Sequence, residues 1–540
     1  MGVSSIDVTL FRKMVMNGAI NLKNNQEEVN QLNVFPVPDG DTGTNMSMTI
    51  TSGVNEMTNS ESSSIIDVAK VLSRGALMGA RGNSGVILSQ FFRGIYVGLK
   101  ENTTNELDKF GLLKCFASGR TIAFKAVTEP VEGTILTFIR EAYEKVNTMI
   151  DQVADVEELM RKYLEIAKDT LAHTPDLLPV LKEAGVVDSG GAGFVKIMEG
   201  WMLAIEGVSL EVADAKTNSA QAAQESKTEL KYFYDVETII SLKKAESFES
   251  ADLVSSVSLV GDALTVTKDN DLVKVHVHTN KPGKILDICL KLGELITVKV
   301  DNLKVKPQVK EAALGIKEAP KKPLAIISVC FGDGIISTFK EMGVDYVISG
   351  GQTMNPSTES FVEAIKEVNA ENVIIIPNNG NVVMAAKQAA NLVEGTNVAV
   401  IMAKTIAQGF SSLMYYDPEA DLETNVSNME EAISNVTSGE VTYSVRDTEI
   451  GGVKINTDDY MGIANGKIVI STKERVDALK SLLSDCINEE SHMVTFFYGK
   501  DVLEDEVAEL ENITTSINPN VDVEIIDGKQ DIYSYIIAVE

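Results

Sequence analysis

The residues best suited to chemistry lie in one loop near the start of the sequence, Asn33-Val-Phe-Pro-Val-Pro-Asp-Gly-Asp-Thr-Gly-Thr-Asn-Met46. Asp39 and Asp41 stand two residues apart, and two prolines restrict the backbone that leads to them. The glycines of the loop allow positive φ angles, so backbone N–H groups can converge on an anion. Carboxylates can hold a cation while the cation and the amides hold phosphates, so this loop is suited to a magnesium–phosphate complex.

A calcium loop and an ordinary turn are the two alternatives for these residues. An EF-hand calcium loop counted from Asp39 would require glycine at its sixth position and glutamate at its twelfth. The sequence has Thr44 and Ile50 there, which excludes that motif. An ordinary turn remains open on residue types alone, because Pro, Gly and Asp are also the common turn formers.

The elements that must position this loop are helices. Apolar residues recur at helical spacing through residues 1–206, as at Leu10, Met14 and Leu22, and this pattern predicts an almost wholly helical region. Loops rich in Gly and Pro interrupt it at 33–45, 79–85, 129–134 and 185–193. If the helices form a barrel, all four loops can meet at one end of it.

The segment Pro-Val-Pro-Asp-Gly-Asp-Thr-Gly-Thr-Asn-Met resembles the motif of a nucleotide-binding domain found in two kinds of kinase, the L subunit of dihydroxyacetone kinase and the nucleotide-binding subunit of bacterial fatty acid kinase. The preceding Asn-Val-Phe-Pro resembles the fatty acid kinase branch. The resemblance implies an antiparallel barrel of about eight helices. It also implies ATP held through two magnesium ions, with Asp39 and Asp41 as the matching metal ligands. Asn33 stands near the place of a third acidic ligand of the dihydroxyacetone kinases.

The same resemblance implies nucleotide contacts from all four loops. The candidates are Asn33, Thr42, Gly43, Thr44 and Asn45 in the first loop, Gly82, Asn83 and Ser84 in the second, Thr134 in the third, and Asp188, Gly190 and Gly191 in the fourth. Glycines and a serine at the start of a helix can donate to phosphate. On residue types alone, Ser84, Thr134 and Asp188 could equally be helix N-caps.

A change of composition separates the helical region from the rest of the chain. Residues 207–228 are rich in Ala, Ser, Gln, Lys and Glu without apolar periodicity, which predicts a linker. A small α+β domain is expected at 229–310, with strands at Ser256–Thr267, Leu272–Thr279 and Leu295–Val300 and a helix at Lys284–Leu292.

Two histidines in this middle domain, His276 and His278, fall on one face of the second predicted strand. They could serve a metal, a phosphoryl contact or a proton relay, or simply form a polar strand face. In the fatty acid kinases that the segment resembles, such a pair accompanies a cysteine. Here Asp235 stands in the place of that cysteine and could complete a site of two histidines and one carboxylate, so the metal is left unassigned.

The last region, 311–540, alternates strands and helices and predicts a parallel sheet followed by a second lobe of strands and two helices from about 438. Loops at 332–334, 350–356 and 377–381 follow strands, where such sheets bind ligands. The region resembles the lipid-binding fold of the kinase's partner proteins, and we expect it to dock an acyl-carrying protein. Gly462-Ile-Ala-Asn-Gly-Lys467 departs from a phosphate-binding Walker loop in spacing and predicts a hairpin turn.

Composition limits the partners and the cellular location that we expect for this protein. The 540 residues carry 48 Lys and Arg against 78 Asp and Glu, a net charge of −30, which argues against nucleic acid or an anionic membrane as partners. No apolar run of membrane-spanning length and no signal-peptide pattern appears, so we expect no integral membrane segment and a cytoplasmic location. Four cysteines without CxxC spacing indicate reduced core residues.

The sequence thus favours a fatty acid kinase subunit. It would transfer the γ-phosphoryl group of ATP to a fatty acid carboxylate that a separate fatty-acid-binding protein presents, and the resemblance further implies a homodimer. Two alternatives remain open. One is a dihydroxyacetone-type kinase, and the other is a regulatory protein that senses nucleotide without transferring phosphate.

Overall fold

The computed structural model describes residues 2–34, 40–100, 104–212, 233–243, 248, 250–257, 260–269, 272–302, 320–351, 355–444 and 447–540. Asp39, and most of the linker predicted at 207–228, lie outside these residues. The chain forms two compact units, one of Met1–Ala213 with Pro320–Glu540 and one of Asp214–Ala319. The first unit has a helical part, residues 2–212, and an α/β part, residues 320–540.

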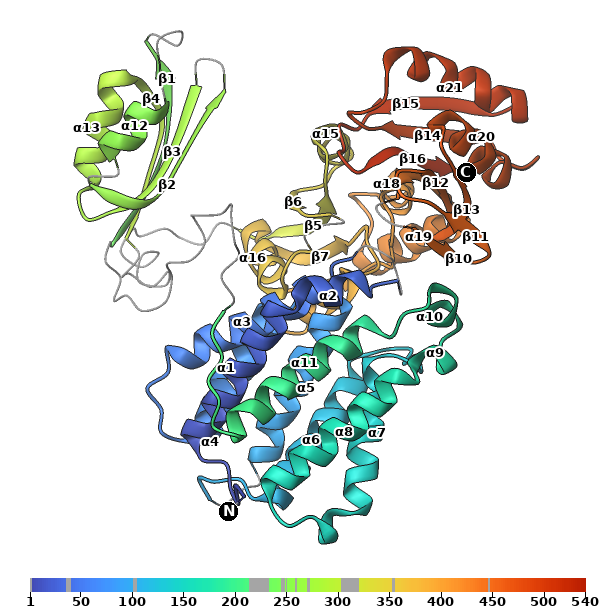
Figure 1. The fold of residues 1–540 in the computed structure, drawn as a ribbon. Coiled ribbons are helices and arrows are strands. Elements are labelled where there is room, and N and C mark those ends of the chain that lie inside the picture. Colours follow the sequence, from blue (N-terminus) through green and yellow to red (C-terminus); the bar gives the residue numbers. More distant parts are fainter. Residues whose placement is uncertain are drawn as a thin grey trace. The chain divides into compact units, whose positions relative to one another are not determined.

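The helical part confirms the prediction of a helical N-terminal region, while its closure into a barrel stays a prediction (Figure 1). Its helices are α1 (Val8–Asn24), α2 (Gln26–Gln31), α3 (Thr42–Thr58), α4 (Ile65–Met78), α5 (Gly82–Leu99), α6 (Lys109–Lys125), α7 (Ile135–Thr148), α8 (Val156–Ala172), α9 (Thr174–Leu177), α10 (Pro179–Ala184) and α11 (Ser189–Ile205), with a short 3₁₀ helix at Ile150–Gln152.

Helix ends and core packing explain this arrangement. Asp7, Asp108 and Asp155 each cap a helix by accepting a hydrogen bond from a backbone N–H of its first turn. Helix α1 packs against α11, and α5 against α6. The core between the helices contains the single tryptophan, Trp201, which is 1% exposed.

The α/β part begins with a four-stranded parallel sheet in the order β6-β5-β7-β8, which confirms the predicted strand–helix alternation. Its strands are β5 (Lys322–Cys330), β6 (Tyr346–Ser349), β7 (Ala370–Ile376) and β8 (Asn397–Val400). The helices of this lobe are α15 (Asp333–Glu341), α16 (Thr358–Val368), α17 (Val383–Ala390), α18 (Ile406–Met414) and α19 (Leu422–Asn435).

The second lobe is a mixed six-stranded sheet in the order β13-β12-β9-β16-β14-β15. Its elements are β9 (Thr437–Tyr443), β12 (Tyr460–Ala464), β13 (Lys467–Thr472), α20 (Arg475–Cys486), β14 (Met493–Tyr498), α21 (Glu504–Ile517), β15 (Asp522–Asp527) and β16 (Tyr533–Val539), with a separate hairpin of β10 (Thr448–Ile450) and β11 (Val453–Ile455). The predicted hairpin is confirmed, because β12 and β13 pair antiparallel across Asn465 and Gly466, which both have positive φ.

The second unit contains a four-stranded sheet in the order β2-β3-β1-β4, and its described residues include two helices. Its elements are β1 (Tyr234–Leu242), α12 (Ser250–Val257), β2 (Gly261–Asp269), β3 (Leu272–Thr279), α13 (Pro282–Leu292) and β4 (Gly293–Asn302). The strand predicted from Ser256 is wrong at its start, because that residue belongs to α12. Apolar spacing in so short a segment does not separate a helix end from a strand start.

Candidate functional site

A cavity of about 220 Å³ opens in the first unit where the four Gly-rich loops meet. Each loop contributes to its lining. The lining residues are Asn33, Asp41, Thr42 and Asn45, then Asn83, Ser84 and Ile87, then Val127, Glu129, Val131, Thr134, Ile135 and Leu136, then Asp188, Ser189 and Gly190, and finally Asn381 and Met384 from the α/β part.

Four helices begin at this cavity. Their first residues are Thr42 of α3, Gly82 of α5, Ile135 of α7 and Ser189 of α11, and residues at or next to each start line the cavity. The first backbone N–H groups of a helix have no partner within the helix, and the helix dipole adds partial positive charge at that end. Four such ends around one cavity favour a polyanionic ligand.

Asp41 lies at the N-cap position of α3, yet its side chain makes no capping hydrogen bond. Its carboxylate is instead in contact with Asn355 of the α/β part, whose Nδ2 lies 2.5 Å from Asp41 Oδ2. Asp41 is only 7% exposed. A buried carboxylate that is not used as a helix cap is suited to a cation, because an opposite charge offsets the cost of burying it.

The start of α5 has a strained backbone that its glycine permits. Gly82 has φ +60°, and a Cβ there would lie 2.6 Å from Nδ2 of Asn45. The glycine therefore lets α5 begin against α3, which places Asn83 and Ser84 beside Asn45 in the cavity lining. These polar groups and Asp41 form what we call the polar end of the cavity.

The cavity lining also contains apolar side chains. These are Ile87, Val127, Val131, Ile135 and Leu136, and a planar heterocycle can be held by such side chains. Helix N-termini and aliphatic side chains in one cavity suit the two parts of a nucleotide, its phosphates and its base.

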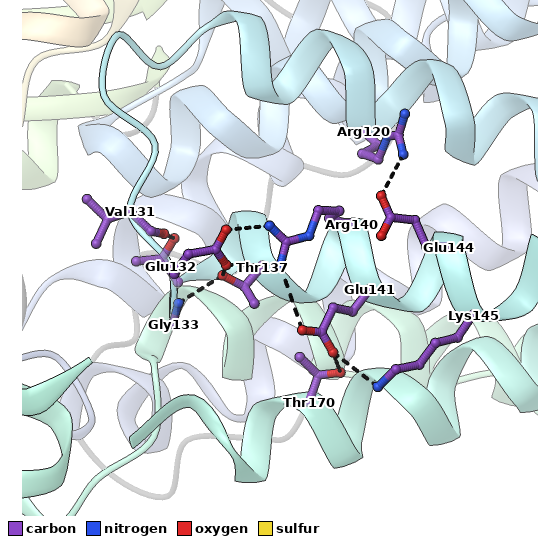
Figure 2. A network of polar contacts seen from close by, with 11 residues as sticks. Arg120, Val131, Glu132, Gly133, Thr137, Arg140, Glu141, Glu144, Lys145 and Thr170 are labelled. Carbon is purple, nitrogen blue, oxygen red and sulfur yellow. Dashed lines mark hydrogen bonds and ion pairs between the residues drawn. The ribbon is translucent and has the colours of Figure 1, made fainter. Parts of the chain in front are cut away.

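The third loop is braced by a polar network behind it (Figure 2). Thr137 Oγ1 accepts from Gly133 N at 2.8 Å and donates to Glu132 Oε2 at 2.8 Å, and Arg140 Nη2 donates to the same Glu132 oxygen at 3.0 Å. The hydrogen bond from Arg140 lowers the pKa of Glu132. These contacts fix the backbone that leads to Thr134, one of the lining residues of this loop.

Asp188 caps α11, and its Oδ2 accepts from Gly191 N at 2.6 Å. Burial raises the pKa of this carboxyl group to about 7, although backbone hydrogen bonds from Gly191 and Ile135 oppose the shift. Its neighbour Ser189, which the sequence interpretation missed, donates to Thr42 Oγ1 at 3.2 Å and so joins the starts of α3 and α11.

Some predicted site residues do not line the cavity. Thr44 accepts side-chain hydrogen bonds from Gln26 and Asn30 and ties α3 to α2. Gly43 allows the same two helices to approach, since a Cβ there would lie 2.3 Å from Gln26 O. Gly82 and Gly191 act through the backbone contacts described above. Asp39 lies outside the described residues.

Comparison with known proteins identifies the family. A family model described as the DAK2 domain matches residues 36–203, and the models for the FakA-like middle and C-terminal domains of fatty acid kinase match 231–310 and 325–540. Protein YloV of Bacillus subtilis is 40% identical over 556 residues, with all of both chains covered. An uncharacterized protein of Staphylococcus epidermidis is 42% identical over 554 residues at the same coverage. The chain belongs to the FakA-like family of fatty acid kinase subunits.

Membership in the FakA-like family makes the chain a kinase-type protein that uses ATP. Among solved structures, a DegV family protein from Corynebacterium glutamicum covers 40% of the chain at 12% identity and a TM-score of 0.32. The dihydroxyacetone kinase of C. freundii covers 41% at 15% identity and a TM-score of 0.31, and at these scores neither structure bears on function. No helix within the described ranges is long and apolar enough to cross a membrane.

The polar end offers donors that fit a magnesium–nucleotide complex. Asn83 Oδ1 and Asn355 Oδ1 are buried oxygen atoms that have no hydrogen-bond partner among the described residues, and such atoms commonly indicate a missing ligand or ion. Within the described part of the chain no cluster of three His, Cys, Asp or Glu residues could hold a metal. Asp41 and the amide oxygens could share a magnesium ion with the phosphates, and Asp39, outside the described residues, stays the predicted second carboxylate ligand.

The histidine pair of the second unit lies on strand β3. His278 pairs with Asp235 of β1 and with Asp262 of β2, while His276 pairs with Glu237 and Thr265. The backbone register pairs Asp235 with His278, and a site of two histidines and one carboxylate stays a prediction. The side chains of Asp235, Asp262 and His276 lie outside the described residues.

Proposed function

We propose that this chain is the ATP-binding subunit of a fatty acid kinase and that the cavity of the four loops is its nucleotide site. In the proposed reaction a fatty acid carboxylate oxygen attacks the γ-phosphorus of ATP. The bond from that phosphorus to the β–γ bridging oxygen breaks, and the products are acyl phosphate and ADP. The single observation that carries the proposal is the convergence of four helix N-termini and Asp41 on one cavity.

The roles of the residues follow from their places. Asp41, with Asp39 from the same loop, would hold the magnesium ions, which supply charge neutralisation for the phosphates. Asn45, Asn83 and Ser84 would donate to phosphate oxygens at the polar end. Asp188, Gly190 and Thr134 would contact the nucleoside, together with aliphatic side chains of the lining.

A carboxylate acceptor fits the chemistry of this lining. The lining residues include no histidine or lysine among the residues that the structure describes, and their carboxylates are Asp41, Glu129 and Asp188. A fatty acid is already ionised at neutral pH, so its phosphorylation requires no base from this set. Positioning and electrostatic stabilisation can then supply the catalysis.

The acceptor would be presented by a separate fatty-acid-binding protein, as is expected for this family. We assign its docking to the α/β part, residues 320–540, and retain the homodimer as part of the proposal. His276 and His278 are kept as catalytic candidates, either for a metal or for a phosphoryl contact.

The test is magnesium-dependent ADP release from ATP, measured with wild type and Asp41→Ala in the presence of a fatty-acid-loaded binding protein. The proposal predicts turnover that requires both lipid and binding protein and is lost in the variant. Phosphorylation of a triose instead would favour a dihydroxyacetone-type kinase. ATP binding without turnover under any of these conditions would favour a nucleotide sensor.

A further inference from the structure

One hydrogen bond joins the candidate metal ligand to a residue far along the chain. Asn355 Nδ2 donates to Asp41 Oδ2 at 2.5 Å across 314 sequence positions. Asn355 is 1% exposed and Asp41 7% exposed, so both groups are buried in this contact. A hydrogen bond to a charged acceptor is stronger than one between neutral groups, particularly away from water.

Asn355 is held in place from the helical part. Arg81 Nη1 donates to the Asn355 backbone O at 2.7 Å, and three residues on, Thr358 N donates to Ala80 O at 3.1 Å. Arg81 is itself partly buried, and desolvation lowers its pKa. The backbone that carries Asn355 is thus fixed by contacts from the second loop, directly before the start of α5.

Two other amide pairs join the same parts of the first unit without reaching Asp41. Asn83 Nδ2 donates to Asn381 Oδ1 at 3.1 Å, and Gln90 Nε2 donates to Gln388 Oε1 at 2.8 Å. The pair of Gln90 and Gln388 offers a comparison, because in it too a side-chain amide of the α/β part contacts a polar side chain of the helical part, but away from Asp41.

We propose that Asn355 is a positioning residue for the metal site, an inference that rests on the nucleotide site proposed above. Its N–H donor fixes the orientation of the Asp41 carboxylate, so the carboxylate does not have to reorient when the cation and phosphates bind. Carboxylates that bind metals are commonly held by such hydrogen bonds from an outer shell, and losing one typically costs about 10–100-fold in metal affinity.

This assignment couples the two parts of the first unit. Because Asn355 belongs to the α/β part and Asp41 to the helical part, binding of the metal–nucleotide complex strengthens when the α/β part is in place. By thermodynamic reciprocity, the bound complex also stabilises the contact between the two parts. The proposed docking region for the acceptor protein would then sense whether the nucleotide site is loaded.

The experiment measures ADP affinity by calorimetry, in the full-length chain, over a range of Mg²⁺ concentrations and in the presence of a chelator. The variants are Asn355→Ala and Asn355→Leu, whose side chain has the same branching as Asn without its polar atoms, with Gln388→Ala as the control. We expect both Asn355 variants to weaken the Mg²⁺-dependent part of ADP binding by about 10–100-fold. ADP binding without metal should be unchanged, and Gln388→Ala should match wild type in both conditions.

A double-mutant cycle separates positioning from a general structural role. In an Asp41→Asn background, Asn355→Ala should have no further effect on Mg²⁺ dependence, because the carboxylate that it orients is gone. If Asn355→Ala and Asn355→Leu keep wild-type Mg²⁺ dependence, or weaken metal-free binding equally, the positioning role is refuted while the proposed function stands. If wild type itself shows no Mg²⁺-dependent ADP binding, the proposed nucleotide site fails, and this inference fails with it.

Discussion

Asp188 allows a quantitative prediction of how the stability of the fold depends on pH, because burial raises the pKa of its carboxyl group. The structure raises the pKa of this carboxyl group from 3.8 to about 7. The neutral form is therefore favoured in the folded state, and the unfolded chain loses its proton at a lower pH. Stability from this group is fully present below the unfolded pKa near 3.8 and falls as pH rises toward about 7.

The size of the effect follows from the shift. A difference of about three pKa units corresponds to about 4 kcal/mol between the acid and alkaline limits, at 1.36 kcal/mol per unit. Between about pH 5 and about pH 8 the loss should be about 3 kcal/mol. Asp188→Asn keeps a side-chain acceptor for Gly191 N but cannot ionise. Wild type should therefore lose about 3 kcal/mol of unfolding free energy relative to Asp188→Asn as the pH rises from about 5 to about 8.

The assay is urea unfolding of the nucleotide-free protein at the two pH values, followed by the fluorescence of Trp201. This residue is the single tryptophan and lies in α11, the helix that Asp188 caps. Asp108→Asn is the matched control, since Asp108 caps α6 in the same way but is exposed. If Asp188→Asn and wild type show the same pH dependence, then Asp188 is ionised in the folded state and the reasoning from burial is wrong.

Two further predictions concern glycine strain and the Walker-like segment. Gly82→Ala should lower the free energy of unfolding by about 1–3 kcal/mol, because the residue has φ +60° and its Cβ would press on Asn45. The same variant should bind ADP more weakly in calorimetry. An unchanged melting temperature would contradict the predicted loss of stability. Lys467→Ala should leave ADP affinity at the wild-type value, because Lys467 begins strand β13 of a hairpin; a clear loss of affinity would mean that this segment binds phosphate after all.

The sequence was informative where one local feature decides one local outcome. Gly-rich loops between helices predicted four breaks, and the structure brings residues of all four to one cavity. Asn465 and Gly466 predicted a hairpin, since few residues other than these adopt two successive positive φ values. Alternating strands and helices predicted the parallel sheet in the same way.

The sequence was uninformative where an outcome depends on contacts between distant segments. Thr44 has a plausible residue type for phosphate, but its hydroxyl is used by Gln26 and Asn30. Nothing near Asp41 indicates that its partner would be Asn355, 314 positions away. The one available signal was that Asn355 and Asn381 fall in strand-end loops, where ligands of α/β sheets gather.

The most direct test of the account is calorimetric binding of ATP with Mg²⁺ to wild type and to Asp41→Asn. Asp7→Asn serves as the control, because Asp7 is an N-cap aspartate that does cap its helix. Wild type and the control should bind ATP with equal affinity. Loss of an outer-shell partner typically lowers metal affinity by about 10–100-fold. Asp41→Asn removes a proposed direct ligand, so its affinity for ATP with Mg²⁺ should fall by more than that. Equal binding by all three proteins would show that the metal–nucleotide site does not depend on Asp41 and would contradict the central claim.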